Sequence, residues 1–556
     1  MTGPLTSLQS ARSAVAALAA GGVQDVVLAP GSRSAPLAYA LAEAELQHRI
    51  RVHVRIDERA AGFLALGLAR GGHRPAAVVT TSGTAVGELV PAVMEAHHAA
   101  VPLVVLSADR PAELHGTGAN QTTVQPGLFS GFPVAEANVE AGEDPAGAIA
   151  EAFAAPSGGA TGPIHINLQF RDPLVPGIED PLGLEPAAGP AAVSTVPEPG
   201  EDERVRVPAE PGTARTVVIA GDGAGEIAAL FARRAGLPLL AEPSSNARFG
   251  PNAVVAYRLL LEQLGPRIQR VVVFGRPTLS RPVAALLARP DVQRAIYLPR
   301  PVNWFRPGRR QETVITDLTA LFAFSGTGSA AWLKLWQDAS AAAQRALQSV
   351  LDREPGLTGL RVAQLVWEHT DGNLVVGSSN PVRDLDLIAA PARHPLDVYA
   401  NRGLAGIDGM ISTASGVALA NGIPTRLLAG DLTFLHDAGG LLVPRTETEP
   451  DLQVVVLNDT GGGIFSVLEH GALGEQPEYA ELVERFFGTP HDADLAALAA
   501  GYGVRHQLVT SDAELDAALA APISGRSVLE VPVQRHGLRR LHAAVRNAVQ
   551  GALDVG

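Results

Sequence analysis

Arg426-Leu-Leu-Ala-Gly430-Asp431 is a short aliphatic run that ends in a carboxylate, and Val454-Val-Val-Leu457-Asn458-Asp459 is a second run of the same kind. Such runs are typical of buried parallel strands, whose carboxyl ends reach one edge of a sheet. Short β-branched runs alternate with Ala- and Leu-rich segments of helical period along the rest of the chain. This alternation predicts βα units on parallel sheets.

The predicted strands fall into three groups, so we expect three domains in series. The fold class is α/β, with three doubly wound parallel-sheet domains. We place them at residues 1–175, 213–352 and 353–556, with a linker at 176–212 where Pro, Glu and Gly collect. A long helix is predicted over 330–351, before the natural stop at Pro355 and Gly356.

Composition excludes several classes of protein. The chain has 556 residues, 46% of them hydrophobic, which is enough for several cores. Its net charge of −14 has the wrong sign for binding nucleic acid or an anionic membrane. There is no cysteine, which excludes disulfides and thiolate chemistry. The only lysine, Lys334, does not lie in a glycine loop, which disfavours P-loop enzymes and Schiff-base enzymes. Because we find no leader-like or spanning apolar run, we expect a cytoplasmic protein.

The two strands that end in carboxylates predict a metal site. Asp431 and Asp459, with a carbonyl of the glycine turn at 461–463, would offer oxygen ligands to a hard cation such as Mg²⁺. The glycines would let backbone amides approach a diphosphate, and Ile464-Phe465 would begin a helix beside it. Either aspartate alone is more often a helix N-cap. The pair favours a metal-bridged diphosphate.

Two further features are ambiguous by themselves. Gly221-Asp222-Gly223-Ala-Gly225 resembles a shortened dinucleotide loop, but it lacks the final glycine spacing, and we favour a structural turn. Asp57 is expected to cap a helix that begins at Glu58, with Gly62 and Gly67 allowing close packing. Taken alone, Glu58 would only complement the helix dipole.

The metal motif resembles the Gly-Asp-Gly…Asn-Asn signature of thiamine-diphosphate enzymes. This resemblance implies that Asp431, Asp459 and the carbonyl of Gly461 bind Mg²⁺ or Mn²⁺. The chain departs from the signature at two positions, because Leu432 replaces the last glycine and Asp459 replaces the second asparagine. The extra carboxylate adds repulsion when no metal is bound.

A closer resemblance extends over the first and last domains. Its segments are Ala29-Pro-Gly-Ser-Arg-Ser34, Asp57-Glu58-Arg59, Thr81-Ser-Gly-Thr-Ala85, Ala108-Asp-Arg-Pro111, Gly118-Ala-Asn-Gln121, Asn401-Arg-Gly403, Gly406-Ile-Asp-Gly409 and Gly461-Gly-Gly-Ile-Phe465. In this order they are similar to the family of 2-succinyl-5-enolpyruvyl-6-hydroxy-3-cyclohexene-1-carboxylate synthases, thiamine-diphosphate enzymes of menaquinone biosynthesis. The resemblance implies that the first domain binds the pyrimidine and the last binds the diphosphate and the metal.

The resemblance also implies the reaction and its residues. The family decarboxylates 2-oxoglutarate and adds the succinyl carbanion equivalent to isochorismate. The residues that it implies as cofactor contacts are Glu58, Ile407, Gly430, Asp431, Asp459, Gly461, Gly462 and Ile464. The resemblance implies that Glu58 acts in catalysis by hydrogen-bonding N1′ of the aminopyrimidine. It also implies catalytic roles for Ser32 and Gln121, which would orient substrate or water by hydrogen bonds. Substrate contacts implied are Arg33, Arg110, Arg281, Arg383, Arg402, Ser379, Phe465 and Leu468, since arginine forks match dicarboxylates.

The family pattern places the Glu58 domain of one subunit against the Asp431 domain of another, so we expect a homodimer or homotetramer. Three alternatives remain open. The first is another thiamine carboligase or 2-oxoacid decarboxylase, of the acetolactate-synthase kind. The second is a nucleotide-binding oxidoreductase that uses the loop at 221–225. The third is a non-catalytic scaffold of the same fold.

Overall fold

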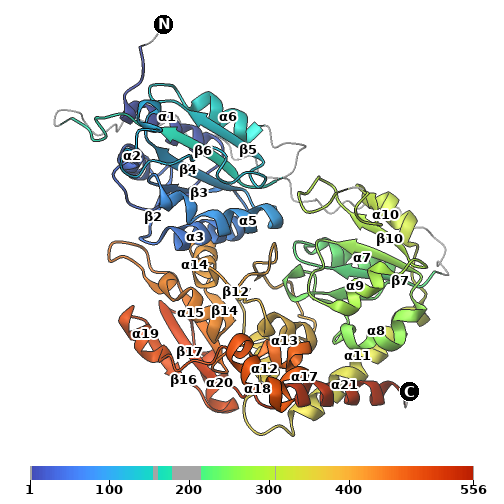
Figure 1. Cartoon of the computed structure of the whole chain (residues 1–556). Helices are drawn as coiled ribbons and strands as arrows, with labels where there is room; N and C mark the ends of the chain where they lie inside the picture. Colours follow the sequence, from blue (N-terminus) through green and yellow to red (C-terminus); the bar gives the residue numbers. More distant parts are fainter. Residues whose placement is uncertain (1–2, 155–160, 178–213, 307, 555–556) are drawn as a thin grey trace.

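The structure is a computed structural model that describes residues 3–154, 161–177, 214–306 and 308–554 (Figure 1). Three parallel sheets follow one another along the chain, each with helices packed on its faces. This confirms the predicted fold class. The predicted linker lies outside the described residues except at 176–177.

The N-terminal sheet has the strand order β2-β1-β3-β4-β6-β5, with all neighbours parallel. Its strands are β1 (Asp25–Leu28), β2 (Arg51–Val54), β3 (Ala76–Thr80), β4 (Leu103–Asp109), β5 (Ala135–Val139) and β6 (Ile164–Gln169). Its helices are α1 (Ser7–Ala20), α2 (Ala35–Leu46), α3 (Glu58–Gly72), α4 (Thr84–Gly87), α5 (Val90–Ala99) and α6 (Ala146–Ala154). Separate apolar cores form on the two faces of this sheet because its central strands are buried on both sides.

The central sheet has the order β11-β10-β9-β7-β8. Its strands are β7 (Thr216–Ala220), β8 (Leu239–Ala241), β9 (Arg270–Phe274), β10 (Gln293–Tyr297) and β11 (Thr313–Ile315). Its helices are α7 (Ile227–Ala235), α8 (Tyr257–Leu264), α9 (Arg281–Ala288), α10 (Leu318–Ser325) and α11 (Ala330–Leu351). Helix α11 has the predicted bounds, and the Ser329 side chain caps it by accepting from the Trp332 N–H.

The C-terminal sheet has the order β13-β12-β14-β15-β17-β16. Its strands are β12 (Asn373–Val376), β13 (Val398–Tyr399), β14 (Thr425–Gly430), β15 (Leu452–Asn458), β16 (Arg505–Leu508) and β17 (Arg526–Pro532). Its helices are α12 (Gly359–Glu368), α13 (Asn380–Ile388), α14 (Met410–Asn421), α15 (Asp431–His436), α16 (Ile464–Val467), α17 (Glu469–Gly474), α18 (Pro477–Val483), α19 (Leu495–Gly501), α20 (Asp512–Ala520) and α21 (Leu538–Asp554). Strands β14 and β15 are parallel neighbours, with Gly430 opposite Leu457.

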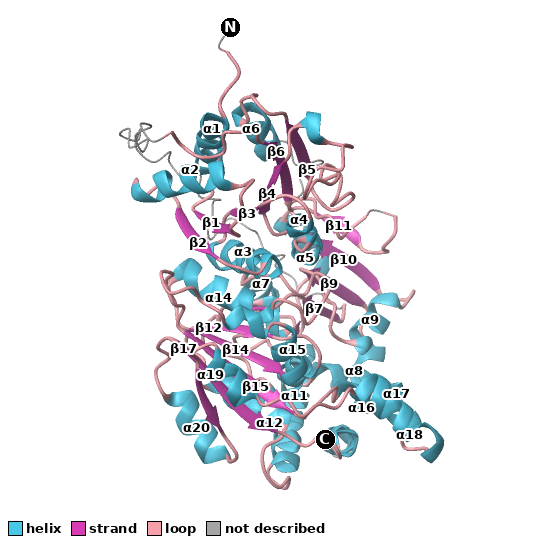
Figure 2. Ribbon diagram, turned by 60° about the vertical axis from the view of Figure 1, so that its left-hand side comes forward, coloured by secondary structure: helices cyan, strands magenta, loops and turns pink. Residues whose placement is uncertain are grey.

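The first and last domains meet through α3 and α14, which lie side by side in both views (Figures 1 and 2). A Cβ on Gly67 would lie 2.1 Å from the Thr413 carbonyl oxygen, and one on Gly416 would lie 2.2 Å from that of Leu64. Close backbone approach therefore explains these glycines and confirms the packing predicted for Gly67.

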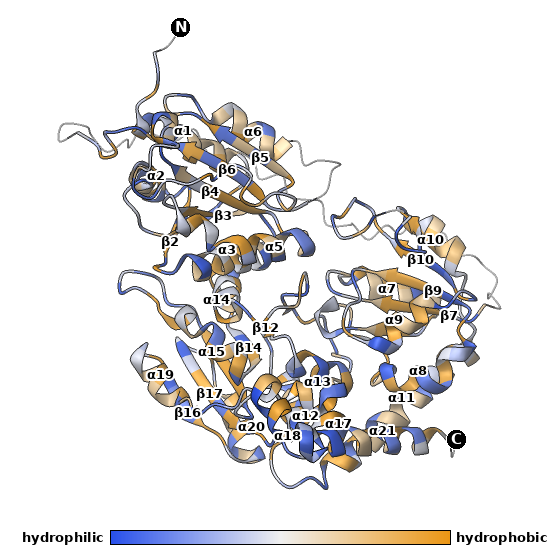
Figure 3. Ribbon diagram, in the orientation of Figure 1, coloured by the Kyte–Doolittle hydropathy of each residue, from blue (hydrophilic) through white to orange (hydrophobic). Residues whose placement is uncertain are grey.

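Hydrophobic residues concentrate in the sheets and on the helix faces that cover them (Figure 3). Among the described residues, no helix is both long enough and apolar enough to cross a membrane.

Candidate active site

A cavity of about 300 Å³ opens at the carboxyl ends of β14 and β15. The segments that line it include the stretch at 354–359, the starts of α13, α15 and α16, and the connection between β17 and α21. The sequence-predicted residues among its lining are Ser379, Ile407, Gly430, Asp431, Asp459, Gly461, Gly462, Ile464 and Phe465. Polar residues from distant segments thus converge at the predicted sheet edge.

Asp431 connects the two strand ends. It is the first residue of α15 rather than its cap, and only 2% of it is exposed. One carboxylate oxygen accepts a hydrogen bond from the Leu432 N–H at 2.7 Å, and the other accepts from the Gly461 N–H at 2.8 Å. Burial raises the pKa of Asp431, and these N–H donors oppose that shift.

Asp459 faces the same space as Asp431. Its Oδ1 is buried and accepts no hydrogen bond from the described residues. Burial, followed by the charge of Asp431, raises the pKa of Asp459 to about 7. Two close carboxylates with a buried, unpartnered oxygen fit a divalent cation, which would neutralise the repulsion and take further oxygen ligands from a carbonyl, phosphate and water.

We predict that Asp459→Asn stabilises the chelator-treated protein. The folded-state pKa of about 7 lies above the ordinary 3.8, so ionised Asp459 opposes folding increasingly as the pH rises from about 4 to 7. At pH 8 the variant should melt about 2–4 °C higher than the wild type, and the gain should shrink at pH 5. Thermal unfolding in EDTA tests this. Adding Mg²⁺ should reverse the ranking, and a variant that melts lower at pH 8 in EDTA would contradict the prediction.

The glycine turn after β15 is shaped by close contacts. A Cβ on Gly461 would lie 2.3 Å from the Gly488 oxygen, and one on Gly463 would lie 1.9 Å from the Asp459 carboxylate. The Gly462 N–H donates to the Gly488 oxygen at 2.7 Å. By contrast, a Cβ on Gly430 would meet nothing within 4 Å. Gly461, Gly462 and Gly463 therefore let the turn pack closely against the neighbouring residues. Helix α16 begins at Ile464 as predicted.

Two residues of the site escaped the sequence interpretation. His491 places Nε2 3.1 Å from the Asp431 carboxylate, yet it lies in a loop with no strand or helix pattern. Asp384 lines the cavity from α13, and burial raises its pKa to about 7. Because α13 looks like an ordinary amphipathic helix in the sequence, only the fold reveals this third carboxyl near Asp459.

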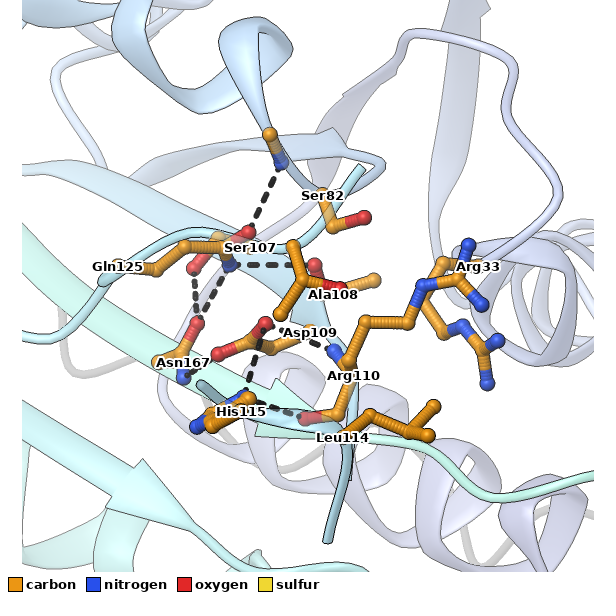
Figure 4. A network of polar contacts seen from close by, with 12 residues as sticks. Arg33, Ser82, Ser107, Ala108, Asp109, Arg110, Leu114, His115, Gln125 and Asn167 are labelled. Atoms are coloured by element: carbon orange, nitrogen blue, oxygen red, sulfur yellow. Dashed lines mark hydrogen bonds and ion pairs between the residues drawn. The ribbon is translucent and has the colours of Figure 1, made fainter. Parts of the chain in front are cut away.

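The N-terminal domain brings Arg33 and Arg110 together (Figure 4). Arg33 is 5% exposed and donates from Nη1 to the Phe170 carbonyl at 2.8 Å. Burial and then the charge of Arg110 lower the pKa of Arg33. The Nε atoms of both arginines are buried without a partner among the described residues. A carboxylate would satisfy both donors.

A buried polar network fixes the backbone of Arg110 (Figure 4). The Asp109 carboxylate accepts from the Arg110 N–H at 2.7 Å and from the Asn167 side chain at 2.9 Å. His115 Nε2 lies 3.0 Å from the Arg110 carbonyl oxygen. Asp109 and Asn167 are fully buried, so this arrangement is rigid.

Ser32 and Gln121 lie on loops of the same domain. Ser32 is exposed beside Arg33, and Gln121 has a left-handed backbone with φ of 55°. The Gln121 amide donates to the Ser82 carbonyl at 2.8 Å, which fixes its orientation. Their catalytic roles stay predictions.

A second arginine pair lies in the C-terminal domain. Arg402 is 4% exposed, donates from Nη2 to the Thr278 hydroxyl at 3.0 Å, and keeps a buried Nε without a described partner. Arg383 donates to the Ser379 carbonyl at 2.7 Å. Burial and then the charge of Arg402 lower the pKa of Arg383. The charges of the two arginines therefore interact, and a shared anion would relieve their repulsion.

Other predicted residues lie away from these groups. The Arg281 side chain is 77% exposed on α9 and pairs with Glu469 of α17. Leu468 follows α16 directly and does not line the cavity within the described chain. Glu58 begins α3, capped as predicted by Asp57, whose carboxylate accepts from the Ala60 N–H at 2.9 Å. In the described part of one chain, Glu58 does not line the Asp431 cavity.

The glycine loop at 221–225 is a structural turn. A Cβ on Gly221 would lie 2.1 Å from the Pro277 nitrogen, and Asp222 donates its N–H to the Arg276 carbonyl at 3.1 Å. Glu242, which directly follows β8, is buried and accepts from the Thr278 and Leu279 N–H groups. The start of the loop at Gly221 is therefore packed against the backbone of residues 276–277.

The fold and the carboxylate cavity define a thiamine-diphosphate enzyme. Residues 9–128 match the family model for the N-terminal TPP binding domain of thiamine pyrophosphate enzymes, and residues 386–531 match the C-terminal TPP binding domain. Benzoylformate decarboxylase from Polynucleobacter necessarius shares the fold, with a TM-score of 0.66 at 16% identity over 95% of this chain and 99% of that chain.

Curated relatives identify the family within this class. The chain is 58% identical to 2-succinyl-5-enolpyruvyl-6-hydroxy-3-cyclohexene-1-carboxylate synthase from Renibacterium salmoninarum, over 99% of this chain and 98% of the relative. It is 57% identical to the synthase of the same name from Paenarthrobacter aurescens, over 99% of this chain and 98% of the relative. The chain belongs to the family of 2-succinyl-5-enolpyruvyl-6-hydroxy-3-cyclohexene-1-carboxylate synthases.

Proposed function

We propose that this protein decarboxylates 2-oxoglutarate and joins the remaining four-carbon unit to isochorismate, giving 2-succinyl-5-enolpyruvyl-6-hydroxy-3-cyclohexene-1-carboxylate for menaquinone biosynthesis. The convergence of Asp431 and Asp459 at one cavity carries this proposal, because it fits a metal-bridged diphosphate. The full-length identity to synthases of that name supports the choice of substrates.

Asp431, Asp459 and the carbonyl of Gly461 would hold Mg²⁺ or Mn²⁺. Gly430, Gly462 and Ile464 would line the diphosphate, and Ile407 would support the rings of the cofactor. Thiamine diphosphate, when bound, supplies the nucleophilic carbon and accommodates the electron pair left by decarboxylation. The protein's own task is to orient the cofactor, exclude water and hold the proton that activates it.

Glu58 would hold that proton against the pyrimidine nitrogen N1′. Since Glu58 does not line the Asp431 cavity within the described part of one chain, we propose that two subunits build each site in a homodimer or a homotetramer. Ser32 and Gln121 would orient the substrate or a water molecule by hydrogen bonds.

The two arginine pairs would hold the dicarboxylates. The first pair offers the buried Nε atoms of Arg33 and Arg110, and the second pair offers that of Arg402; no described residue satisfies these three atoms. Arg–carboxylate pairs are strong in such surroundings because each fork can bind both oxygens. Ser379, Phe465, Leu468 and Arg281 would complete the substrate contacts.

An omission assay tests the proposal. Purified protein should consume 2-oxoglutarate rapidly only when thiamine diphosphate, Mg²⁺ and isochorismate are all present. Consumption of pyruvate instead would favour an acetolactate-type carboligase. Bound flavin or tight binding of NAD would favour an oxidoreductase, and retention of thiamine diphosphate without turnover would favour a scaffold.

Mixing inactive variants tests the shared site. One variant lacks the Glu58 carboxyl and the other lacks the Asp431 carboxylate. After dissociation and reassociation, a mixed dimer has one site with both groups intact, so the equimolar mixture should recover about a quarter of wild-type activity. The unmixed variants under the same treatment are the controls. If the mixture stays inactive although mass spectrometry shows mixed dimers, one subunit builds the whole site.

A further inference from the structure

The segment at 400–404 is held by all three domains. It follows β13 in the C-terminal domain and contains Arg402. From the N-terminal domain, Arg70 of α3 donates to the Ala400 carbonyl at 2.5 Å. From the central domain, Arg276 donates to the Gly403 carbonyl at 2.8 Å. Because hydrogen bonds reach the backbone on both sides of Arg402, its peptide planes cannot turn freely.

Glu95 of α5 makes the most complete of these contacts. One carboxylate oxygen accepts the Gly403 N–H at 2.7 Å, and the other accepts the Leu404 N–H at 2.7 Å. Glu95 is only 4% exposed. Burial raises its pKa, and the two N–H groups and then the charge of Arg70 oppose that shift. Burying a carboxyl group costs free energy, so a buried carboxylate with both oxygens bound to backbone N–H groups indicates a specific role in the protein.

Gly403 is shaped to fit Glu95. A Cβ at this position would lie 2.7 Å from the Glu95 backbone oxygen and 2.9 Å from its carboxylate carbon. Any side chain on residue 403 would therefore push Glu95 away from the two N–H groups. The close approach accounts for the glycine that follows Arg402 in the chain.

Arg402 needs this support because Arg383 lies near it. The charge of Arg402 lowers the pKa of Arg383, so the two cations repel each other when no anion lies between them. The described residues give the Arg402 side chain one hydrogen bond, to Thr278, and leave its buried Nε unpartnered. A fixed backbone keeps this guanidinium in place before a substrate binds, which reduces the entropy lost on binding.

We propose that Glu95 is a positioning residue for substrate recognition, which fixes the backbone at 403–404 and so directs Arg402 toward a carboxylate of a dicarboxylate substrate. The inference rests on the proposed function. It adds to that function a contribution from α5 of the same chain, 308 positions away from Gly403.

Glu95→Gln tests the inference with minimal change of shape. The amide keeps one acceptor but turns an NH₂ group toward a backbone N–H, so one hydrogen bond is lost and two donors meet. The KM of the substrate that Arg402 binds should rise about tenfold, while kcat stays within about twofold of wild type. Both KM values are measured on the holoenzyme. Glu43→Gln is the matched control, because Glu43 is 5% exposed and pairs with Arg12 of α1.

A double-mutant cycle with Arg402→Lys shows whether Glu95 acts through Arg402. If it does, both single variants raise the same KM, and the double variant is hardly worse than Arg402→Lys alone. Additive effects, effects on different substrates, or an unchanged KM in Glu95→Gln would overturn the inference. A merely structural role would lower thermal stability and leave the two effects additive.

Two further variants keep the test decisive. If Glu95→Gln does not fold, the cycle is run with Glu95→Asp, which keeps the charge but shortens the reach. Thr278→Val removes the only hydrogen bond that the described residues give the Arg402 side chain, and should raise the same KM. Failure of the proposed function would appear earlier and separately, as a wild-type protein that does not consume 2-oxoglutarate with isochorismate.

Discussion

Glu58→Gln is expected to lower kcat by about 10³-fold or more while thiamine diphosphate still binds. Glutamine has the size of glutamate and can still hydrogen-bond a ring nitrogen, but it cannot hold or release the activating proton. The local structure should survive, because Glu58 is the first residue of α3 and the Asp57 cap does not depend on it. Turnover and cofactor affinity are measured on the same preparation.

Glu151→Gln is the control for this substitution, because Glu151 is exposed on α6 of the same domain. Wild-type turnover in Glu58→Gln would remove the assigned role. Loss of turnover together with an equal loss of cofactor affinity would make Glu58 a binding group rather than the activating one.

Local sequence patterns predicted the parts of this fold that local physics determines. The bounds of α11 follow from its helical period and its Ser329 cap, and the Asp57 cap was visible in the same way. Asp431 and Asp459 could be paired because parallel strands end at one edge, and β14 and β15 are indeed neighbours. The sequence-predicted cofactor contacts of the C-terminal domain therefore line one cavity.

The remaining contacts depend on tertiary packing and have no local signal. His491 meets Asp431 across 60 positions, from a loop without periodicity. Glu95 looks like any polar residue of a helix until α5 is packed against the segment after β13. Only the family resemblance implies a role for Arg281, and the structure places it on an exposed face paired with Glu469. Its substrate role stays a prediction.

Asp431→Ala is expected to weaken Mg²⁺-dependent binding of thiamine diphosphate by on the order of 100-fold. The substitution removes one cation ligand, and it also removes the acceptor that ties the Gly461 N–H to α15 at 2.8 Å. The turn at 461–463 would lose this hydrogen bond to α15, so the Gly461 carbonyl would be held less firmly toward the cation. Two contributions to the site would therefore be lost in one variant.

Calorimetric titration of thiamine diphosphate at fixed Mg²⁺ measures this loss, with Asp338→Ala on α11 as a control whose side chain is 63% exposed. Asp431→Asn separates the two contributions, because its amide oxygen can still accept the Gly461 N–H but carries no charge for the cation. The affinity for thiamine diphosphate should be highest in the wild type, lower in Asp431→Asn and lowest in Asp431→Ala. If all three proteins bound the cofactor equally, the cation would have to bind at another site. The proximity of Asp431 and Asp459 would then be structural and would not form the metal site.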